Sequence, residues 1–416
     1  MLGSGASDGW PNPWCSCASC DDARQQGVHR AQSAALLDGT VLLDLPPTTA
    51  LHDLSGVTLV LVTHDHADHH FPQAWVWRAW ATTSGPLTVL APPSVLAGAS
   101  FDPAVTAVPV APGDVHEVDG YAVRVLDAEH PHDAVLYDVT GPDGGRLLYA
   151  TDTGVLPEST VEAVRARDFD VVLLELAGTP IPSHLTLETW PAQVNRLLAA
   201  GAVTERTRLV ATHLGHHNPP PDELDRRLAA LGASAARDGD VVDTGGGRRV
   251  LVLGGQSSGK SAYAESLVRG AVTYVATAPA REDDADWDRR VAAHVERRPA
   301  SWTTVETGDV TGVLTATGGP VLVDDLGLWV TRVLEGHWDS PAARKVFDEA
   351  LHDLDAAWAG TRRHVVLVAP EVGSGVVPGN AAARLFADLL GRATTLLAGH
   401  ADEVVQVVAG QPRRLR

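Results

Sequence analysis

Short apolar runs, separated by Gly, Pro and Asp, recur through residues 34–212 of the chain. This pattern is typical of short β-strands joined by turns. It predicts strands over residues 34–45, 57–63, 86–90, 121–126, 146–150, 171–176 and 208–212. Apolar positions with helical spacing predict helices over residues 73–82, 159–166, 187–200 and 221–232. This part is therefore expected to be an α/β domain with many short strands and few helices.

The rest of the chain alternates strand and helix patterns more regularly. Strands are predicted over residues 249–253, 272–276, 319–323, 363–368 and 402–408, and helices over 260–269, 284–297, 341–358 and 380–398. Such alternation predicts an α/β domain with a mostly parallel sheet. The flexible stretch DTGGGRR at residues 243–249 separates the two patterns. We therefore expect two domains, residues 1–245 and residues 248–416.

Composition and charge exclude several classes of protein. The chain has 416 residues, of which 44% are hydrophobic and 20% charged, enough for two domains with full cores. A net charge of -20 repels a phosphate backbone, so no bulk binding of nucleic acid is expected. No apolar run reaches the roughly 18 residues of a membrane span, and the start MLGSGASDG lacks the features of a signal peptide. The expectation is a cytoplasmic protein without a membrane partner.

The first candidate site for chemistry is the stretch THDHADH at residues 63–69, directly after the apolar run LVLV. His64, His66, Asp68 and His69 would leave the end of a strand together. Imidazole nitrogens suit Zn²⁺, and a carboxylate adds a ligand that also accepts Mn²⁺. A solvated polar loop is the alternative, but this spacing favours a site for two neighbouring metal ions.

This motif resembles the metallo-β-lactamase superfamily, whose members are αββα sandwich hydrolases with one or two metals. The resemblance implies three further ligands after apolar strands: His130, Asp152 and His213. One metal would take His64, His66 and His130, and the second Asp68, His69 and His213. Asp152 and a water would bridge the two ions, which are expected to be Zn²⁺ or Mn²⁺. Asp68 is also expected to act in catalysis.

The three cysteines of the chain, Cys15, Cys17 and Cys20, lie within six positions. An odd, closely spaced set is a poor disulfide framework and a good set of metal ligands, although free thiols remain the alternative. With His216 as a fourth ligand they would hold a structural Zn²⁺. This pattern resembles the phosphodiesterase branch of the superfamily that opens cyclic phosphoribosyl phosphates. His184 matches a catalytic histidine of that branch, which contacts the substrate phosphate.

The resemblance leaves two features of residues 1–245 open, namely the roles of His70 and His132 and the first strand of the sandwich. His70 and His132 are neighbours of ligands and either support them or lie exposed on a loop. The family also begins with a strand before its glycine-rich turn, whereas Met1 already lies in that turn. We therefore expect either that the first strand of the sandwich is missing or that the true start codon lies upstream.

The second candidate site is a phosphate-binding loop after the strand at residues 250–253. Its residues fit the pattern G-x-x-x-x-G-K-[ST] and are Gly254, Gly255, Gln256, Ser257, Ser258, Gly259, Lys260 and Ser261. The backbone N–H groups of such a loop surround phosphate oxygens, and the lysine contacts the β- and γ-phosphates. Lys260 is one of only two lysines in the chain. Ser261 would bind Mg²⁺ together with Asp324, which ends the strand VLVD, while Asp325 is an alternative.

Residues 248–416 as a whole resemble adenosylcobinamide kinase / adenosylcobinamide-phosphate guanylyltransferase. The resemblance rests on the phosphate loop and on the segments VTYVATA at 272–278, RVAAHVERRP at 290–299, EVGSG at 371–375 and RLFADLLG at 384–391. It implies ATP, GTP and adenosylcobinamide as substrates, with Mg²⁺. His294 would carry the guanylyl group, Glu371 would help to bind the nucleotide, and the enzyme would be a homo-oligomer.

This half departs from the family at two places. Pro370 replaces the usual Asn, and Thr394-Thr395 replace an Asn-Gln pair, which leaves the preference for nucleotide or corrinoid open. The sequence thus predicts a bifunctional enzyme of cobalamin synthesis fused to a dinuclear metal phosphodiesterase. Two alternatives stay open: the P-loop half only senses nucleotide and regulates the hydrolase, or the N-terminal half is an interaction module without turnover.

Overall fold

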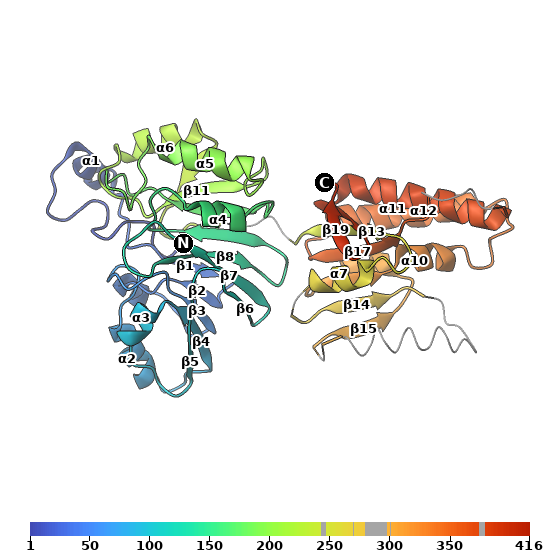
Figure 1. The fold of residues 1–416 in the computed structure, drawn as a ribbon, viewed down its shortest axis with the longest axis horizontal. Coiled ribbons are helices and arrows are strands. Elements are labelled where there is room, and N and C mark those ends of the chain that lie inside the picture. Colours follow the sequence, from blue (N-terminus) through green and yellow to red (C-terminus); the bar gives the residue numbers. More distant parts are fainter. Residues whose placement is uncertain (243–246, 269, 279–297, 300, 374–378) are drawn as a thin grey trace. The chain divides into compact units, whose positions relative to one another are not determined.

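The computed structural model describes residues 1–416 except 243–246, 269, 279–297, 300 and 374–378. The chain forms two compact units, residues 1–140 with 146–244 and residues 141–145 with 245–416 (Figure 1). The helix expected over residues 284–297 lies outside the described residues. Among the residues described, no helix is both long and apolar enough to cross a bilayer.

The first unit contains two sheets. The five-stranded sheet has the order β1-β2-β3-β4-β5, and the seven-stranded sheet has the order β12-β11-β10-β9-β8-β7-β6. The strands of the first sheet are β1 (Ala35–Leu37), β2 (Val41–Leu43), β3 (Leu59–Leu61), β4 (Leu87–Ala91) and β5 (Val105–Pro109). Those of the second are β6 (Val115–Val118), β7 (Tyr121–Asp127), β8 (Val135–Thr140), β9 (Arg146–Ala150), β10 (Val171–Glu175), β11 (Arg208–Thr212) and β12 (Ala233–Ala235).

Helices cover the outer face of each sheet in this unit. They are α1 (Ala18–Gln26), the short η1 (Pro47–Leu51), α2 (Gln73–Trp80), α3 (Pro93–Ala97), α4 (Glu158–Ala163), α5 (Trp190–Ala199) and α6 (Pro221–Ala229). Residues such as Leu61 of β3 and Tyr137 of β8 form one core between the two sheets. Trp75 of α2 packs on the outer face of the first sheet, and Trp190 of α5 packs on that of the second. The predicted αββα sandwich is confirmed.

Several elements differ from the sequence prediction. The single strand expected over 34–45 is a hairpin, because Asp38 and Gly39 turn the chain with φ of 50° and 75°. The strands β5, β6, β8 and β12 were not predicted. In β5 and β6 no residue is fully buried, so those two strands lack a strong apolar signal. Gly3 and Gly5 make isolated bridges to Ala34 and Gln32 instead of a strand.

The second unit is a single sheet with the strand order β15-β14-β16-β17-β13-β18-β19. All neighbouring strands are parallel except β18 and β19. The strands are β13 (Arg249–Gly254), β14 (Thr273–Ala276), β15 (Thr303–Glu306), β16 (Val321–Asp324), β17 (Val365–Pro370), β18 (Glu403–Val408) and β19 (Gln411–Arg414). The helices are α7 (Lys260–Ser266), α9 (Val310–Thr315), α10 (Leu326–Val333), α11 (Ala343–Gly360) and α12 (Ala381–His400).

Both faces of this parallel sheet are buried. Ala264 of α7 belongs to the apolar core on one face, and Phe347 of α11 and Leu397 of α12 belong to the core on the other. Consecutive residues of β13 alternate between the two, with Val250 on the first side and Leu251 on the second. The predicted α/β domain with a mostly parallel sheet is confirmed.

Candidate metal centre and nucleotide loop

The proposed metal ligands leave the sandwich at the carboxyl ends of its strands. His64 follows β3, His130 follows β7, Asp152 follows β9 and His213 follows β11. Strands β9, β10 and β11 are parallel neighbours, so their carboxyl ends lie at one edge of the sheet. Asp152 and His213 have φ of 55° and 54°, a left-handed conformation that non-glycine residues adopt mainly where the surrounding structure enforces it.

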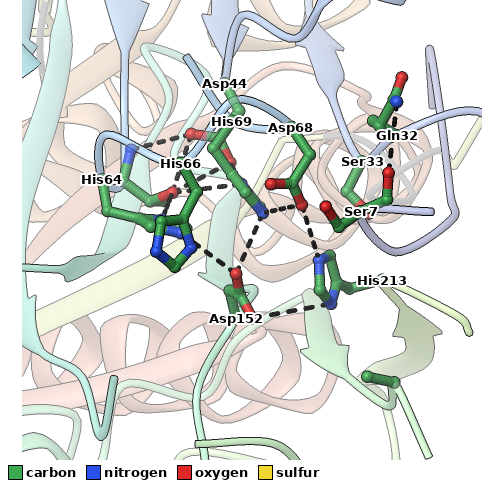
Figure 2. A network of polar contacts seen from close by, with 12 residues as sticks. Ser7, Gln32, Ser33, Asp44, His64, His66, Asp68, His69, Asp152 and His213 are labelled. Atoms are coloured by element: carbon green, nitrogen blue, oxygen red, sulfur yellow. Dashed lines mark hydrogen bonds and ion pairs between the residues drawn. The ribbon is translucent and has the colours of Figure 1, made fainter. Parts of the chain in front are cut away.

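The structure brings the predicted ligands together in two sets. In each set the candidate ligand atoms lie within 4.8 Å of one another, and Asp152 belongs to both. The first set is His64, His66, His130 and Asp152, and the second is Asp68, His69, Asp152 and His213. The Asp152 Oδ2 atom lies 3.1 Å from His64 Nε2 and 3.4 Å from His69 Nε2. Figure 2 shows the members of these sets that it labels, His64, His66, Asp68, His69 and His213, around the Asp152 carboxylate.

The polar atoms at the centre of this cluster fit a pair of cations. His64 Nε2, His69 Nε2 and Asp152 Oδ1 are buried, and in the described part of the chain they have close charged contacts with one another and with His184 but no well-aligned hydrogen bond. Buried polar atoms are almost always satisfied, because leaving one unpaired is costly. Divalent ions between the two sets would satisfy these atoms.

The charges in the cluster also suit metal binding. Burial lowers the pKa of His64, and it lowers the pKa of His130 to about 4, so both rings are neutral at pH 7 and offer lone pairs. Burial alone would raise the pKa of Asp152, but the nearby His213 and a hydrogen bond from His184 hold it well below its ordinary value. His64 and His130 are therefore neutral imidazoles next to an ionised carboxylate, as a Zn²⁺ or Mn²⁺ ion requires. Burial alone would lower the pKa of His69 and of His213 as well, but nearby carboxylates raise both, that of His213 to about 10, so these two rings would release a proton when a metal binds.

The sequence analysis missed a carboxylate that orients one ligand. Asp44, at the end of β2, is fully buried and accepts a hydrogen bond from His69 Nδ1 at 2.7 Å. Thr63 Oγ1 and Tyr149 Oη donate to the same carboxylate at 2.9 Å each. A proton held on Nδ1 leaves Nε2 of His69 free for a metal. The available signal was Asp44 itself, which ends the apolar run VLL just as Asp152 ends the run LLYAT.

A second buried carboxylate holds the predicted catalytic histidine. Glu175, the last residue of β10, accepts from the backbone N–H groups of Ala177 at 3.0 Å and Leu185 at 2.7 Å. Its Oε1 atom also lies 3.0 Å from His184 Nδ1, and Asp152 Oδ1 lies 3.0 Å from the same nitrogen. The sequence predicted His184 but not Glu175, because no local pattern links the end of β10 to the loop nine residues later.

The two other histidines of this region have different surroundings. His70 is buried, and its Nε2 accepts a hydrogen bond from Trp75 Nε1 at 3.0 Å. It therefore anchors α2 and does not lie exposed on a loop. His132 is exposed, and its ring packs edge-on against His66 with 5.4 Å between the centroids.

The metal cluster opens into a cavity of about 640 Å³. His66, Asp68, His130, Asp152 and His213 line it together with His184. A cavity of this size accommodates a small organic substrate. The wall that faces the cluster includes polar and apolar side chains from Ser7, Thr179, Ile181 and Ser183.

The cysteines and His216 form the third predicted set. The candidate ligand atoms of Cys15, Cys17, Cys20 and His216 all lie within 4.8 Å of one another. Cys17 Sγ is 3.7 Å from His216 Nδ1, and this contact lowers the pKa of Cys17 to about 6. On the other side of the ring, His216 Nε2 is 3.3 Å from Asp8 Oδ2. Three thiols, an imidazole and a carboxylate behind it match a structural zinc site.

In the second unit, glycines shape the phosphate loop between β13 and α7. A side chain at Gly254 would place Cβ 2.4 Å from Ser258 Oγ and 2.9 Å from the carbonyl oxygen of Val407. Gly259 has a φ of 91° and lies against Gly410. Ser258 Oγ is buried and has no hydrogen-bond partner in the described part of the chain. Gly255, Gln256 and Ser257 form the rest of the loop, and Lys260 and Ser261 begin α7.

The acidic candidates lie at the same edge of the sheet. Asp324 ends β16 and accepts a hydrogen bond from Tyr274 Oη at 2.6 Å. Asp325 caps α10 by accepting from the Leu328 N–H at 2.9 Å, and burial and the charge of Asp324 raise its pKa to about 6. Glu371 follows β17, the strand between β13 and β16, and its N–H donates to the Gly254 carbonyl at 2.9 Å. Of the two aspartates, Asp324 is therefore the better Mg²⁺ candidate.

The remaining residues of this half are only partly described. His294 lies outside the described residues. Pro370 ends β17 and lies close to Gly327. The hydroxyl groups of Thr394 and Thr395 both donate to the carbonyl of Gly391 in their own helix α12.

Comparison with known proteins gives a family-model match in each part of the chain. Residues 250–415 match a family described as cobinamide kinase / cobinamide phosphate guanyltransferase, and residues 34–214 match a β-lactamase superfamily domain. The bifunctional adenosylcobalamin biosynthesis protein CobU of Salmonella typhimurium is 37% identical over 175 residues, which are 39% of this chain and 96% of that protein. CobP of Pseudomonas aeruginosa is 37% identical over 175 residues, 40% of this chain and 97% of that protein.

Solved structures resemble the first part. The metallo-β-lactamase fold protein YhfI from Bacillus subtilis has 13% identity and a TM-score of 0.44, and covers 58% of this chain and 98% of its own. The short form of human tRNase Z has 16% identity and a TM-score of 0.40, and covers 58% of this chain and 97% of its own.

The contact between Asp44 and His69 predicts a specific loss of metal affinity. Asp44→Asn removes the charge that orients the His69 ring, so metal affinity should fall about 10- to 100-fold. Competition with a chromophoric chelator measures this affinity. Asp38→Asn is the matched control, since Asp38 lies in the β1–β2 hairpin just before Asp44 and, among the described residues, accepts a hydrogen bond from the Tyr121 hydroxyl and not from a proposed metal ligand. Equal affinities in the two variants would contradict the role given to Asp44.

The cysteine set predicts a zinc ion that can be lost without loss of the ions in the histidine cluster. Cys17→Ser should remove about one zinc equivalent per chain and lower the melting temperature, while the ions of the histidine cluster remain. Elemental analysis and thermal denaturation check this, with Ser19→Ala as the control on the same helix. An unchanged zinc content in Cys17→Ser would show that these thiols hold no metal.

Proposed function

The chain belongs, through residues 250–415, to the cobinamide kinase / cobinamide phosphate guanyltransferase family, and from this premise we propose a bifunctional enzyme of cobalamin synthesis fused to a metal-dependent phosphodiesterase. The observation that carries the first part is 37% identity across 96% of a bifunctional relative. The intact glycine-rich loop that precedes Lys260 adds to it. We further propose ATP, GTP and adenosylcobinamide as substrates, a homo-oligomeric enzyme and a cytoplasmic location.

The kinase reaction would use the loop of β13 and α7. Backbone N–H groups from Gly255 to Gly259 would hold the phosphates, and Lys260 would contact the β- and γ-phosphates. Ser261 and Asp324 would hold Mg²⁺, which would neutralise charge on the phosphates during transfer. The γ-phosphoryl group would move to the hydroxyl oxygen of adenosylcobinamide, and ADP and a proton would leave. Glu371 would contact the nucleotide from the neighbouring strand.

The guanylyl transfer would proceed through a covalent intermediate. We propose that an imidazole nitrogen of His294 attacks the α-phosphorus of GTP, so that a P–N bond forms and pyrophosphate leaves. A phosphate oxygen of adenosylcobinamide phosphate would then displace the imidazole. The covalent intermediate would divide the transfer of GMP into two displacement steps, each easier than the direct transfer.

The first unit would be the phosphodiesterase. Its basis is the pair of ligand sets that share Asp152 at the wall of one cavity. Two divalent ions, Zn²⁺ or Mn²⁺, would supply Lewis acidity and lower the pKa of a water between them. Asp68 would hold one ion and orient the attacking oxygen. His184, held by Glu175 at 3.0 Å, would contact a phosphate oxygen of the ester.

A regulatory alternative gives the P-loop unit only nucleotide sensing. Covalent labelling separates the two proposals, because a sensor does not form a P–N bond. The fusion itself suggests that the hydrolase acts on a phosphate ester made or salvaged in the same pathway. If the metal-loaded protein cleaves no phosphodiester, corrinoid nucleotides included, this link fails.

The covalent step predicts a labelled protein. After incubation with α-labelled GTP and denaturation, wild type should retain the label, and His294→Ala should retain none. His352→Ala, an exposed histidine on α11, is the control and should label normally. Lys260→Ala should reduce labelling at least about 100-fold, because the negative charge of the GTP phosphates would no longer be neutralised by the Lys260 ammonium group. Label retained by His294→Ala would move the nucleophile elsewhere, and an unlabelled wild type would favour the sensor.

The contact between Glu175 and His184 predicts a catalytic loss without a metal loss. With bis(p-nitrophenyl) phosphate, His184→Ala should lower kcat by about 100-fold or more while metal content stays unchanged. His132→Ala is the control, since that exposed ring lies outside both ligand sets. Equal activity of His184→Ala and wild type would rule out this role.

A further inference from the structure

A buried tyrosine of the second unit is bonded to the carboxylate that ends β16. Tyr274 of β14 is 3% exposed, and its Oη atom donates a hydrogen bond to Asp324 Oδ2 at 2.6 Å. Among the described residues, no other side chain donates to this carboxylate. A packed aromatic ring needs no hydroxyl, and burying a hydroxyl is costly unless it finds a partner. The hydroxyl of Tyr274 therefore indicates a role toward Asp324 in addition to packing.

The register of the sheet explains how the phenol reaches the carboxylate. On the neighbouring strands, Tyr274 lies opposite Leu322 and Ala276 lies opposite Asp324. The tyrosine therefore starts two residues before the level of Asp324, and two residues of a strand span roughly 7 Å. A tyrosine side chain that extends along the sheet covers this distance, so its hydroxyl meets Asp324 at the carboxyl edge.

Neighbouring side chains hold the tyrosine ring in this position. The guanidinium carbon of Arg298 lies 3.4 Å from the centroid of the ring, a cation–π contact. Arg298 Nη1 also donates to Thr304 Oγ1 at 2.9 Å, and Thr304 is the residue of β15 opposite Tyr274. The Trp302 ring stacks beside the phenol with 6.4 Å between the centroids. The ring is thus fixed on the sheet before any ligand binds.

The hydrogen bond leaves one oxygen of the carboxylate for a cation. Asp324 Oδ2 accepts from the phenol, and Oδ1 has no hydrogen-bond partner in the described part of the second unit. Only β17 lies between β16 and β13, the strand that leads into the phosphate loop. Mg²⁺ demands nearly ideal octahedral geometry and is usually bound through one or two carboxylates. A carboxylate that cannot rotate suits such an ion better than a mobile one.

We propose that Tyr274 is a positioning residue, which holds Asp324 through Oδ2 and so keeps Oδ1 available to the Mg²⁺ of the bound nucleotide. This inference rests on the proposed function of the second unit, in which Asp324 binds Mg²⁺. It deepens that function by naming the residue that orients the ligand. Partners of this kind behind a metal ligand affect metal affinity without touching the metal.

The test measures how much Mg²⁺ strengthens nucleotide binding to the full-length protein. The probe is a fluorescent GTP analogue with a methylene group between the α- and β-phosphorus atoms, which blocks guanylyl transfer. Its Kd in EDTA divided by its Kd in Mg²⁺ gives the contribution of the metal to binding. Tyr274→Phe keeps the ring and removes the hydroxyl, so this ratio should fall about 10-fold. The Kd in EDTA should stay unchanged.

Two further variants serve as references for this ratio. Asp324→Ala should lower the ratio at least as much, and Tyr274→Phe added to it should lower it no further, because the tyrosine acts through the carboxylate. A further loss in the double variant would contradict this. Tyr121→Phe is the matched control, since Tyr121 Oη donates to Asp38 Oδ2 at 2.7 Å in the first unit. Loss of that hydrogen bond should leave the ratio unchanged.

The rate of protein labelling by α-labelled GTP provides a readout of activity. In Tyr274→Phe the Mg²⁺ concentration that gives the half-maximal rate should rise about 10-fold, and excess Mg²⁺ should restore the rate. A merely structural role would lower the rate at every Mg²⁺ concentration and weaken binding in EDTA as well. That result would overturn the inference.

Arg298→Met replaces Tyr274→Phe if the latter does not fold, because it frees the ring and keeps the hydroxyl. Its ratio should fall about 3-fold, as expected for the loss of one cation–π contact. A wild-type ratio in folded Tyr274→Phe, or in Arg298→Met where it takes its place, would overturn the inference while Asp324→Ala still shows the Mg²⁺ site. Equal ratios in wild type and Asp324→Ala would instead defeat the proposed Mg²⁺ role of Asp324, and the inference with it.

Discussion

A single buried carboxylate organises the first unit. Asp152 is 3% exposed and lies within 3.6 Å of imidazole nitrogens from His64, His69 and His130. Without cations, such a cluster leaves polar atoms buried and unsatisfied, which a fold tolerates only where function requires it. Asp44 lies behind His69 (Figure 2), and Glu175 lies behind His184. These two carboxylates hold the rings in place and so make the cluster a defined site instead of a loose polar pocket.

In both units, parallel strands bring the candidate site residues together at one edge of a sheet. Parallel strands end at one edge, and the first residues after them carry the chemistry. In the sandwich, β9, β10 and β11 place Asp152, Glu175 and His213. In the second unit, β13, β16 and β17 place the glycine-rich loop, Asp324 and Glu371. Strand order alone therefore brings together residues that are far apart in the chain.

Charge is unevenly distributed along the chain. The net negative charge is concentrated in residues 1–244, while both lysines belong to the rest. A loop with backbone N–H groups and a lysine suits triphosphates.

The sequence by itself determined the features that depend on the spacing of residues within short segments. The spacing of His64, His66, Asp68 and His69 after an apolar strand, and of Gly254 to Ser261 before a helix, was enough to indicate both sites and both fold classes. The tertiary structure alone decided which distant groups support them. The partner of His69 is 25 residues away in Asp44, and the partner of Asp324 is 50 residues away in Tyr274. It also distinguished Asp324 from Asp325, because only packing shows that Asp325 caps a helix. Local pattern records which residue types follow a strand, whereas contacts between strands arise from the sheet that they form together.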